Sequence, residues 1–345
     1  MRNETLINIT WKIGAIALAL ILTTLVLIAA DAPPLAAYIN LFKGSFSSWV
    51  KFSDVLIAWV PLMLVTSGLL ITFAAGLWNI GIEGQIILGA ISTTWALRLL
   101  QDSTLSPVLV IILSILAGMA GGALWASLTG ALKTFGGVNE IFGGLGLNFV
   151  AIAFSLWLIF GPWKRPGVAS MSGTEPFPRT LWLPALEGMR FSPWSVALAV
   201  LGILLVFLLL KGTYFGLRLK AVGKNPKAAY LLGVPTWQYM MVAFIACGAF
   251  AGAAGAMQVT AVYHRLIPSI SSGYGYLGLM VAMLVNYQVV WAVPVALFFA
   301  ALNIGSIQLP IILKLDSSLS GVIQGTLVLS VLLVEGIRQK FMKKK

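Results

Sequence analysis

The segment PVLVIILSILAGMAGGALWASLTGAL, residues 107–132, carries no charged side chain. A helix needs about 20 apolar residues to cross a bilayer, whereas a membrane strand needs about 10. Only helices and closed barrels satisfy every backbone polar group in lipid. The length of this segment therefore predicts a transmembrane helix.

The rest of the chain has the same character. Hydrophobic residues make up 59% of it, charged residues only 9%, and the mean hydropathy is +0.98; soluble domains contain about 25% charged residues. The sequence therefore predicts an all-α, polytopic transmembrane bundle in a single domain, residues 1–345. Ten spans are expected, at 13–30, 55–73, 86–100, 107–132, 141–160, 196–210, 239–262, 274–285, 289–313 and 319–334.

Basic residues set the orientation. The net charge is +12, and a membrane protein gathers Lys and Arg in its cytoplasmic loops for topological reasons, so nucleic-acid binding is not expected. Placing both termini in the cytoplasm puts the basic segment near 211–227 and the tail Lys343–Lys345 on that side. The segment 31–54 then becomes an outer loop.

The basic segment KGTYFGLRLKAVGKNPKAAYLLGVPTWQY, residues 211–239, contains a helix signal. Asn225 is a suitable N-cap, and Pro226 suits the first helical position because proline has no N–H to lose. A short helix is expected over 226–232, with Gly233 in the left-handed conformation behind it and Pro235 preventing continuation. The alternative is an ordinary cytoplasmic loop whose charges only fix the topology.

Two short spans follow glycine-rich breaks, GLWNIGIEGQ at 76–85 and SSGYGY at 271–276. Interrupted membrane segments often mark unwound backbone beside a substrate path. Polar and ionisable side chains facing lipid are costly, so the candidate path residues are Asn79, Glu83, Gln85, Asn148 and Asn286. The alternative is that glycines let helices pack closely, and this is the reading favoured for Gly118, Gly122, Gly248 and Gly252.

Similar small-residue motifs, 117–122 before 144–147 and 247–252 before 276–279, lie on spans of opposite direction. They predict an inverted internal repeat, an arrangement common in transporters.

The chain has no G-x-x-x-x-G-K-[ST], G-x-S-x-G or H-E-x-x-H motif and only one His and one Cys. It is therefore not expected to be an enzyme, to hydrolyse ATP itself or to hold a metal. Its few buried ionisable groups also argue against a secondary transporter, without excluding one.

With these residues in view, the chain resembles ABC importer permeases of the branched-chain amino acid, ribose and nucleoside superfamily, and most of all the nucleoside and simple-sugar group. The resemblance is carried by GLWNIGIEGQIILGA (76–90), GVNEIFGGLGLNFVA (137–151), GLRLKAVGKNPKAAYLLGV (216–234), ISSGYGYLGLMVAML (270–284) and GVIQGTLVLSVLLVE (321–335), in the family's order. One departure is the glycine-rich FGGLG at 142–146, where the family has a β-branched run.

The resemblance implies a multi-pass protein of the bacterial plasma (inner) membrane. Its expected partners are membrane lipid, an ATP-binding subunit carrying ATP–Mg, a second homologous permease chain and an extracytoplasmic substrate-binding protein or lipoprotein. The expected substrate is a nucleoside, with a simple sugar as the alternative and a secondary transporter or channel without an ATPase as the more remote one. The segment 211–238 corresponds to the family's coupling segment, on which fall Gly216, Arg218, Ala221, Gly223, Asn225, Pro226, Ala228, Ala229 and Gly233.

Overall fold

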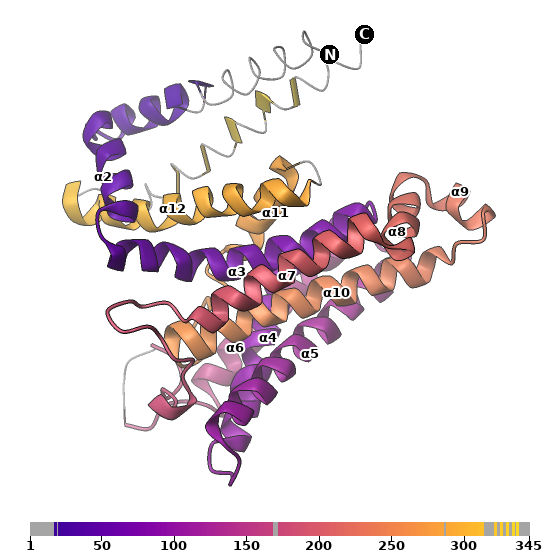
Figure 1. Cartoon of the computed structure of the whole chain (residues 1–345), viewed down its shortest axis with the longest axis horizontal. Helices are drawn as coiled ribbons and strands as arrows, with labels where there is room; N and C mark the ends of the chain where they lie inside the picture. Colours follow the sequence, from indigo (N-terminus) through magenta and orange to yellow (C-terminus); the bar gives the residue numbers. More distant parts are fainter. Residues whose placement is uncertain are drawn as a thin grey trace. The chain divides into compact units, whose positions relative to one another are not determined.

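The computed structural model describes residues 17–18, 20–167, 172–285 and 288–313, and five pairs of residues between 321 and 337. Helices account for all the regular structure in these residues, so the all-α class is confirmed (Figure 1). The chain separates into two compact units, Met1–Ala58 with Phe298–Lys345, and Trp59–Leu297. The structure describes half of the predicted span 319–334, namely 321–322, 325–326, 329–330 and 333–334, and these residues are helical.

The larger unit holds most of the helices. Its elements are the main part of α3 (Trp49–Ala74), α4 (Ile82–Leu100), α5 (Pro107–Thr134), α6 (Glu140–Phe160), the 3-10 turn η1 (Arg179–Leu181), α7 (Pro193–Gly212), α8 (Tyr214–Lys224), α9 (Pro226–Leu231), α10 (Thr236–Met257), the π-helical turn η2 (Gln258–Tyr263), α11 (Tyr274–Leu284) and the start of α12 (Val289–Leu313). Most of these bounds agree with the predicted spans to within a few residues.

Six described helices are long and apolar enough to cross a membrane, or seven if the bent pair 20–29 and 34–46 is one span. Ten spans were predicted. At 1.5 Å per residue the 11 residues of α11 reach only about 17 Å, too short for the hydrocarbon layer. Polar residues including Glu83 and Arg98 interrupt α4, so it is not among the six.

Glycine contacts bring α4, α5 and α10 together. A Cβ added to Gly89 of α4 would lie 2.3 Å from Gly252 Cα of α10, and one added to Gly122 of α5 would lie 2.2 Å from the Gly248 carbonyl oxygen. Backbones this close leave no room for a larger side chain. The packing role predicted for the glycines of α5 and α10 is therefore confirmed.

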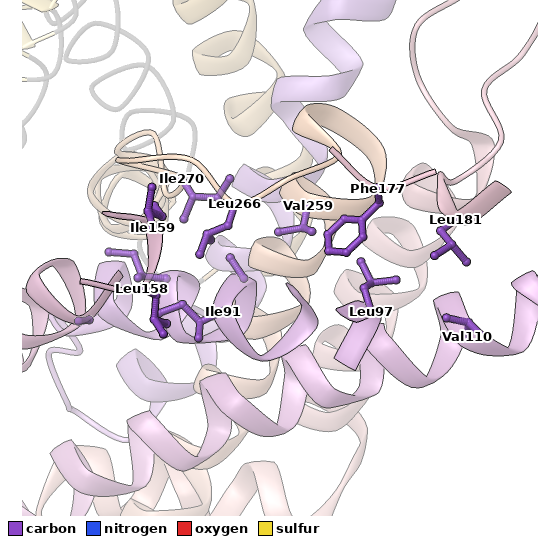
Figure 2. Close-up of a cluster of buried hydrophobic side chains, with 13 residues drawn as sticks. Ile91, Leu97, Val110, Leu158, Ile159, Phe177, Leu181, Val259, Leu266 and Ile270 are labelled. Atoms are coloured by element: carbon purple, nitrogen blue, oxygen red, sulfur yellow. The ribbon is translucent and has the colours of Figure 1, made fainter. Parts of the chain in front are cut away.

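A hydrophobic cluster encloses one end of α4 (Figure 2). Ile91 and Leu97 of α4 pack among Leu158 of α6, Phe177 of the loop after α6 and Val259 of η2. The loop is also joined to the chain beyond η2 through backbone hydrogen bonds, including Phe177 N to His264 O at 2.9 Å. Residues 174–183 of the loop after α6 are thus held against the helices.

In the smaller unit, α2 (Pro34–Phe46) follows helical residues 20–29 after a bend of 112°. The buried cluster of this unit consists of Leu27, Ala32, Ala37, Leu41 and Leu309. Ser45 Oγ donates a hydrogen bond of 2.6 Å to the Ala301 carbonyl oxygen. The segment 31–54, predicted as an outer loop, is largely helical, because α2 and the start of α3 occupy it. Its position on the outer side stays a prediction.

Candidate functional site

The segment between α7 and α10 contains two capped helices (Figure 1). The Thr213 hydroxyl accepts a hydrogen bond from the Gly216 N–H (3.1 Å) at the start of α8, and the Asn225 side-chain oxygen accepts one from the Ala228 N–H (3.1 Å) at the start of α9. Gly233 has φ +80°. The predicted cap and stop of the second helix are confirmed. The first helix, α8, was not predicted.

Two glycines of α8 allow close backbone contact. A Cβ on Gly216 would lie 2.3 Å from the Leu209 carbonyl oxygen, and one on Gly223 would lie 2.3 Å from the Ala74 carbonyl oxygen at the end of α3. Gly76, with φ +72°, is equally close to α8, since a Cβ added to it would lie 2.8 Å from the Gly223 carbonyl oxygen. The coupling candidate α8 thus lies directly on the chain that links α3 to α4.

The other coupling candidates divide between surface and interior. Ala229 is buried and Ala221 is half-buried. The Ala221 carbonyl oxygen accepts a hydrogen bond from the Asn225 N–H at 3.1 Å. Exposed positions are Arg218, Asn225, Pro226, Ala228 and Gly233. Tyr230, Leu231 and Leu232 form an exposed apolar tip, at 67%, 84% and 82% exposure. Because this tip lies outside the candidate spans, it is suited to contact a protein partner.

The break between α3 and α4 covers residues 75–81 and is shorter than the predicted 76–85. Glu83 and Gln85 lie on the first turn of α4, so their predicted placement in unwound backbone is wrong. Asn79 and Gln85, both fully buried, exchange two side-chain hydrogen bonds of 2.9 Å. The Asn79 amide also donates to Cys247 Sγ of α10 at 3.1 Å.

Two further predicted residues tie the break to other helices. Asn148 of α6 accepts the Gly84 N–H (2.8 Å) and donates to the Ile80 carbonyl oxygen (2.9 Å). Glu83 Oε1 accepts the Tyr276 N–H (3.1 Å) in the first turn of α11, whose N-cap residue is a glycine. An acidic group there offsets the partial positive charge of a helix N-terminus. The predicted break 271–276 and the predicted span 274–285 overlapped, and α11 begins at Tyr274, as predicted for the span.

The structure therefore brings four of the predicted path residues together around one break, each bonded within the protein. Asn286 lies outside the described residues. Sequence reasoning missed two neighbours on α5, Trp125 and Thr129: in the described part of the chain, Trp125 Nε1 and Thr129 Oγ1 are buried with no hydrogen-bond partner. A Cβ on Gly84 would lie 2.9 Å from Trp125 Nε1. Buried donors without partners are rare, which makes these two candidates for contact with a ligand.

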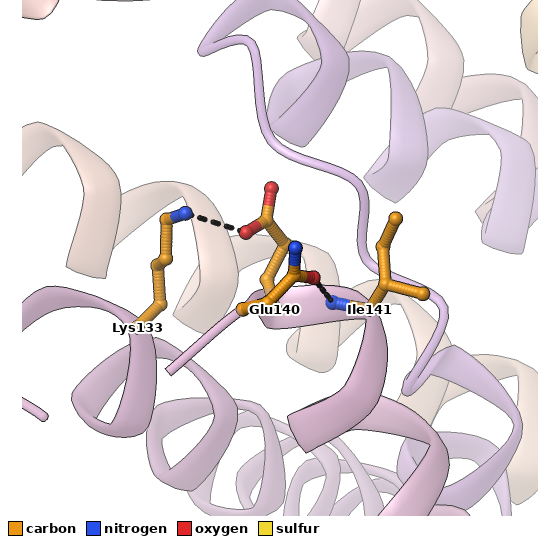
Figure 3. Close-up of polar contacts among 4 residues, drawn as sticks. Lys133, Glu140 and Ile141 are labelled. Atoms are coloured by element: carbon orange, nitrogen blue, oxygen red, sulfur yellow. Dashed lines mark hydrogen bonds and ion pairs between the residues drawn. The ribbon is translucent and has the colours of Figure 1, made fainter. Parts of the chain in front are cut away.

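An ion pair joins the ends of α5 and α6 (Figure 3). Lys133 Nζ lies 2.6 Å from Glu140 Oε2, and the Asn139 side chain caps α6 by accepting the Ile141 N–H at 2.9 Å. The short turn between two spans is thereby fixed. Among the described residues no group of three or more His, Cys, Asp or Glu could hold a metal ion.

Comparison with known proteins finds relatives along most of the chain. Glucose ABC transporter permease protein TsgB13 of Haloferax volcanii is 29% identical over 88% of this chain and 81% of its own. Nucleoside ABC transporter permease protein NupB of Lactococcus lactis subsp. cremoris is 25% identical over 89% and 85%, and guanosine ABC transporter permease protein NupP of Bacillus subtilis is 26% identical over 92% and 91%.

A family model, described as branched-chain amino acid transport system / permease component, matches residues 52–332. Of the six helices that qualify as spans, this range covers five completely and nearly all of the sixth. It also includes α8, α9 and the break between α3 and α4. The protein is a multi-pass membrane permease, and the chain belongs to the branched-chain amino acid transport system permease family.

Proposed function

We propose that this chain is the membrane-spanning subunit of an ATP-driven importer of nucleosides, with ATP–Mg hydrolysed on a separate subunit. The observation that carries the proposal is the direct contact of α8, through Gly223, with the break that contains Asn79. The exposed tip of α9 gives a partner ATPase a surface on which to act. The chain itself needs no catalytic group.

The proposed route for coupling uses one backbone contact and several hydrogen bonds. A displacement of α8 acts on Gly76 through backbone contact. The break that follows is bonded to α6 through Asn148, and the first turn of α4 is bonded to α11 through Glu83. A movement imposed on α9 by an ATPase would therefore reach α4, α6 and α11 together. Packed helices with discrete arrangements transmit such shifts, because they do not deform continuously.

The names of the relatives support a neutral, hydroxyl-rich substrate. NupB and NupP are named for nucleosides and guanosine, and TsgB13 for glucose. Trp125 offers an N–H donor and an aromatic face, and Thr129 a hydroxyl; these groups suit a nucleobase and a ribose. A simple sugar is the second candidate, favoured by the similarity to TsgB13.

Two further partners belong to the proposal. Lactococcus lactis and Bacillus subtilis each contain two permeases similar to this chain, NupB with NupC and NupP with NupQ. This supports pairing with a second, homologous permease. Delivery of substrate by an extracytoplasmic binding protein or lipoprotein completes the importer.

Uptake in cells tests the proposal. The chain is produced with its ATP-binding subunit, sister permease and binding protein in a host that lacks nucleoside uptake, and entry of radiolabelled guanosine, uridine and glucose is measured. Nucleoside uptake that disappears when the ATPase is inactivated is the expected result. Glucose uptake alone would establish the sugar alternative, and uptake unaffected by ATPase inactivation would establish a secondary transporter or channel.

A further inference from the structure

A cavity of about 600 Å³ lies in the larger unit, where the ends of α3 and α7 meet α8 and the start of α12. Its wall is apolar, formed in part by Phe73, Phe207 and Val290. Its rim carries three lysines, Lys211, Lys220 and Lys224, and no acidic residue lines it. An apolar wall beneath a cationic rim matches an amphipathic anion.

All three lysines line the same cavity, and local contacts hold two of them in place. Lys220 Nζ donates a 2.7 Å hydrogen bond to the Leu210 carbonyl oxygen at the end of α7, and Lys211 Nζ lies 5.1 Å from the centre of the Phe207 ring. All three side chains are exposed, and within the described residues none forms an ion pair with a carboxylate. Their mutual repulsion favours an anion between them.

The cavity lies at the ends of three candidate membrane spans. Helices α3, α7 and α12 qualify as membrane spans, and the cavity is at the last turns of α3 and α7 and the first turn of α12. Span ends mark the boundary between hydrocarbon and water. An apolar wall at this boundary is suited to an acyl chain, and clustered basic residues there attract anionic lipid headgroups.

We propose that this cavity binds an anionic phospholipid, with the phosphate among Lys211, Lys220 and Lys224 and an acyl chain against Phe207, Leu210 and Val290. A soluble acidic ligand would not need the apolar wall, and a neutral lipid would leave the three charges uncompensated. Gly76 and Gly223 also line the cavity. The bound lipid therefore braces the contact through which α8 meets the α3–α4 break.

Lipid binding is measured on the purified full chain in neutral detergent by native mass spectrometry, with dioleoyl phosphatidylglycerol as the probe and dioleoyl phosphatidylcholine as the neutral comparison. The test variant is Lys211→Gln with Lys224→Gln. The matched control, Arg218→Gln with Lys227→Gln, removes the same charge from exposed positions of the same segment that do not line the cavity. Melting temperatures in phosphatidylcholine nanodiscs verify that both variants fold.

The wild-type chain should retain phosphatidylglycerol over phosphatidylcholine. A lysine near an anionic group contributes about a fivefold gain in affinity, so the test variant should bind about 25-fold more weakly and the control within about twofold of wild type. Glycerophosphoglycerol, the headgroup without acyl chains, should not compete. Three results would each overturn the proposal: equal losses of affinity in both variants, competition by the free headgroup, or no preference for phosphatidylglycerol in the wild-type chain. The last result would indicate that the lysines bind an acidic protein partner instead.

Discussion

Replacement of Gly223 by alanine tests whether α8 must lie directly on the end of α3. The new Cβ would come 2.3 Å from the Ala74 carbonyl oxygen and 2.9 Å from both Ala75 C and Gly76 N. All three are backbone atoms, which cannot rotate away as a side chain does. Reaching ordinary contact at 3.4 Å requires the two backbones to separate by about 1 Å, the difference between 3.4 and 2.3 Å.

Two opposing energies decide the outcome. Alanine is favoured over glycine inside a helix by about 1 kcal/mol, whereas overpacking a tight contact costs about 1–3 kcal/mol. Because the Gly223 contact is with backbone, the upper value applies, and the net cost is about 2 kcal/mol against the seated position of α8. Since 1.4 kcal/mol is a factor of ten, the seated fraction relative to the displaced one falls about 30-fold.

The assay compares substrate uptake and stimulated ATPase activity in the assembled importer. Both should fall together in Gly223→Ala, while membrane insertion is unchanged. Gly212→Ala is the matched control: Gly212 ends the neighbouring helix α7, and an added Cβ there has no atom within 4 Å. If Gly223→Ala transports and stimulates ATP hydrolysis like the wild type, the contact between α8 and α3 does not carry the coupling.

Asn225→Ala should weaken α9 by about 1 kcal/mol and lower uptake per ATPase complex, whereas Asn225→Ser should not; equal activity of the two variants would contradict a role for the cap. Glu83→Ala should lower the melting temperature more than Glu83→Gln, which keeps an acceptor for the N-terminus of α11; equal losses would deny that capping matters. A cysteine at Thr129, in a chain without the native cysteine, should react with small aqueous thiol reagents and be protected by substrate; inertness would place the path elsewhere. The His264 ring stacks on Trp182 with centroids 3.6 Å apart, and burial lowers the pKa of His264 below its ordinary 6.5. The stabilising contribution of neutral His264 is therefore complete above pH 6.5 and declines as the pH falls below that value. Between pH 7.5 and 5 the melting temperature should drop less in His264→Phe than in the wild type, and an equal drop would show that this titration is irrelevant.

Local signals explain what the sequence predicted well. Helix α12 begins at Val289 and ends at Leu313, as its apolar run indicates, and α9 begins after Asn225 because the cap and Pro226 act on adjacent residues. Both features depend on short-range chemistry: lipid favours unbroken apolar runs, and caps satisfy free N–H groups.

Helices without an unbroken apolar run were missed. α8 buries only Gly216, Leu219 and Val222 and exposes its lysines, so hydropathy gives it the appearance of a loop. Its spacing of buried positions at every third residue, after the Thr213 cap, was the signal that could have found it. α2 was missed for a different reason: Asp31, Pro33 and Pro34 interrupt the apolar run and so indicated a loop, whereas Pro34 begins the helix.

The polar residues show where sequence reasoning stops. An amide in a membrane segment must find a partner, and that requirement drew attention to Asn79, Gln85 and Asn148. Their place on a substrate path stays a prediction. The requirement could not say whether the partner is substrate or protein. In the structure Asn79 and Gln85 satisfy each other across six residues, and Asn148 satisfies the backbone at Ile80 and Gly84.

Any ligand that enters at this break must therefore displace one of these hydrogen bonds or approach from α5, where Trp125 Nε1 and Thr129 Oγ1 have no partner to lose. The second route costs less free energy, since an unsatisfied buried donor gains a hydrogen bond and no existing one is broken.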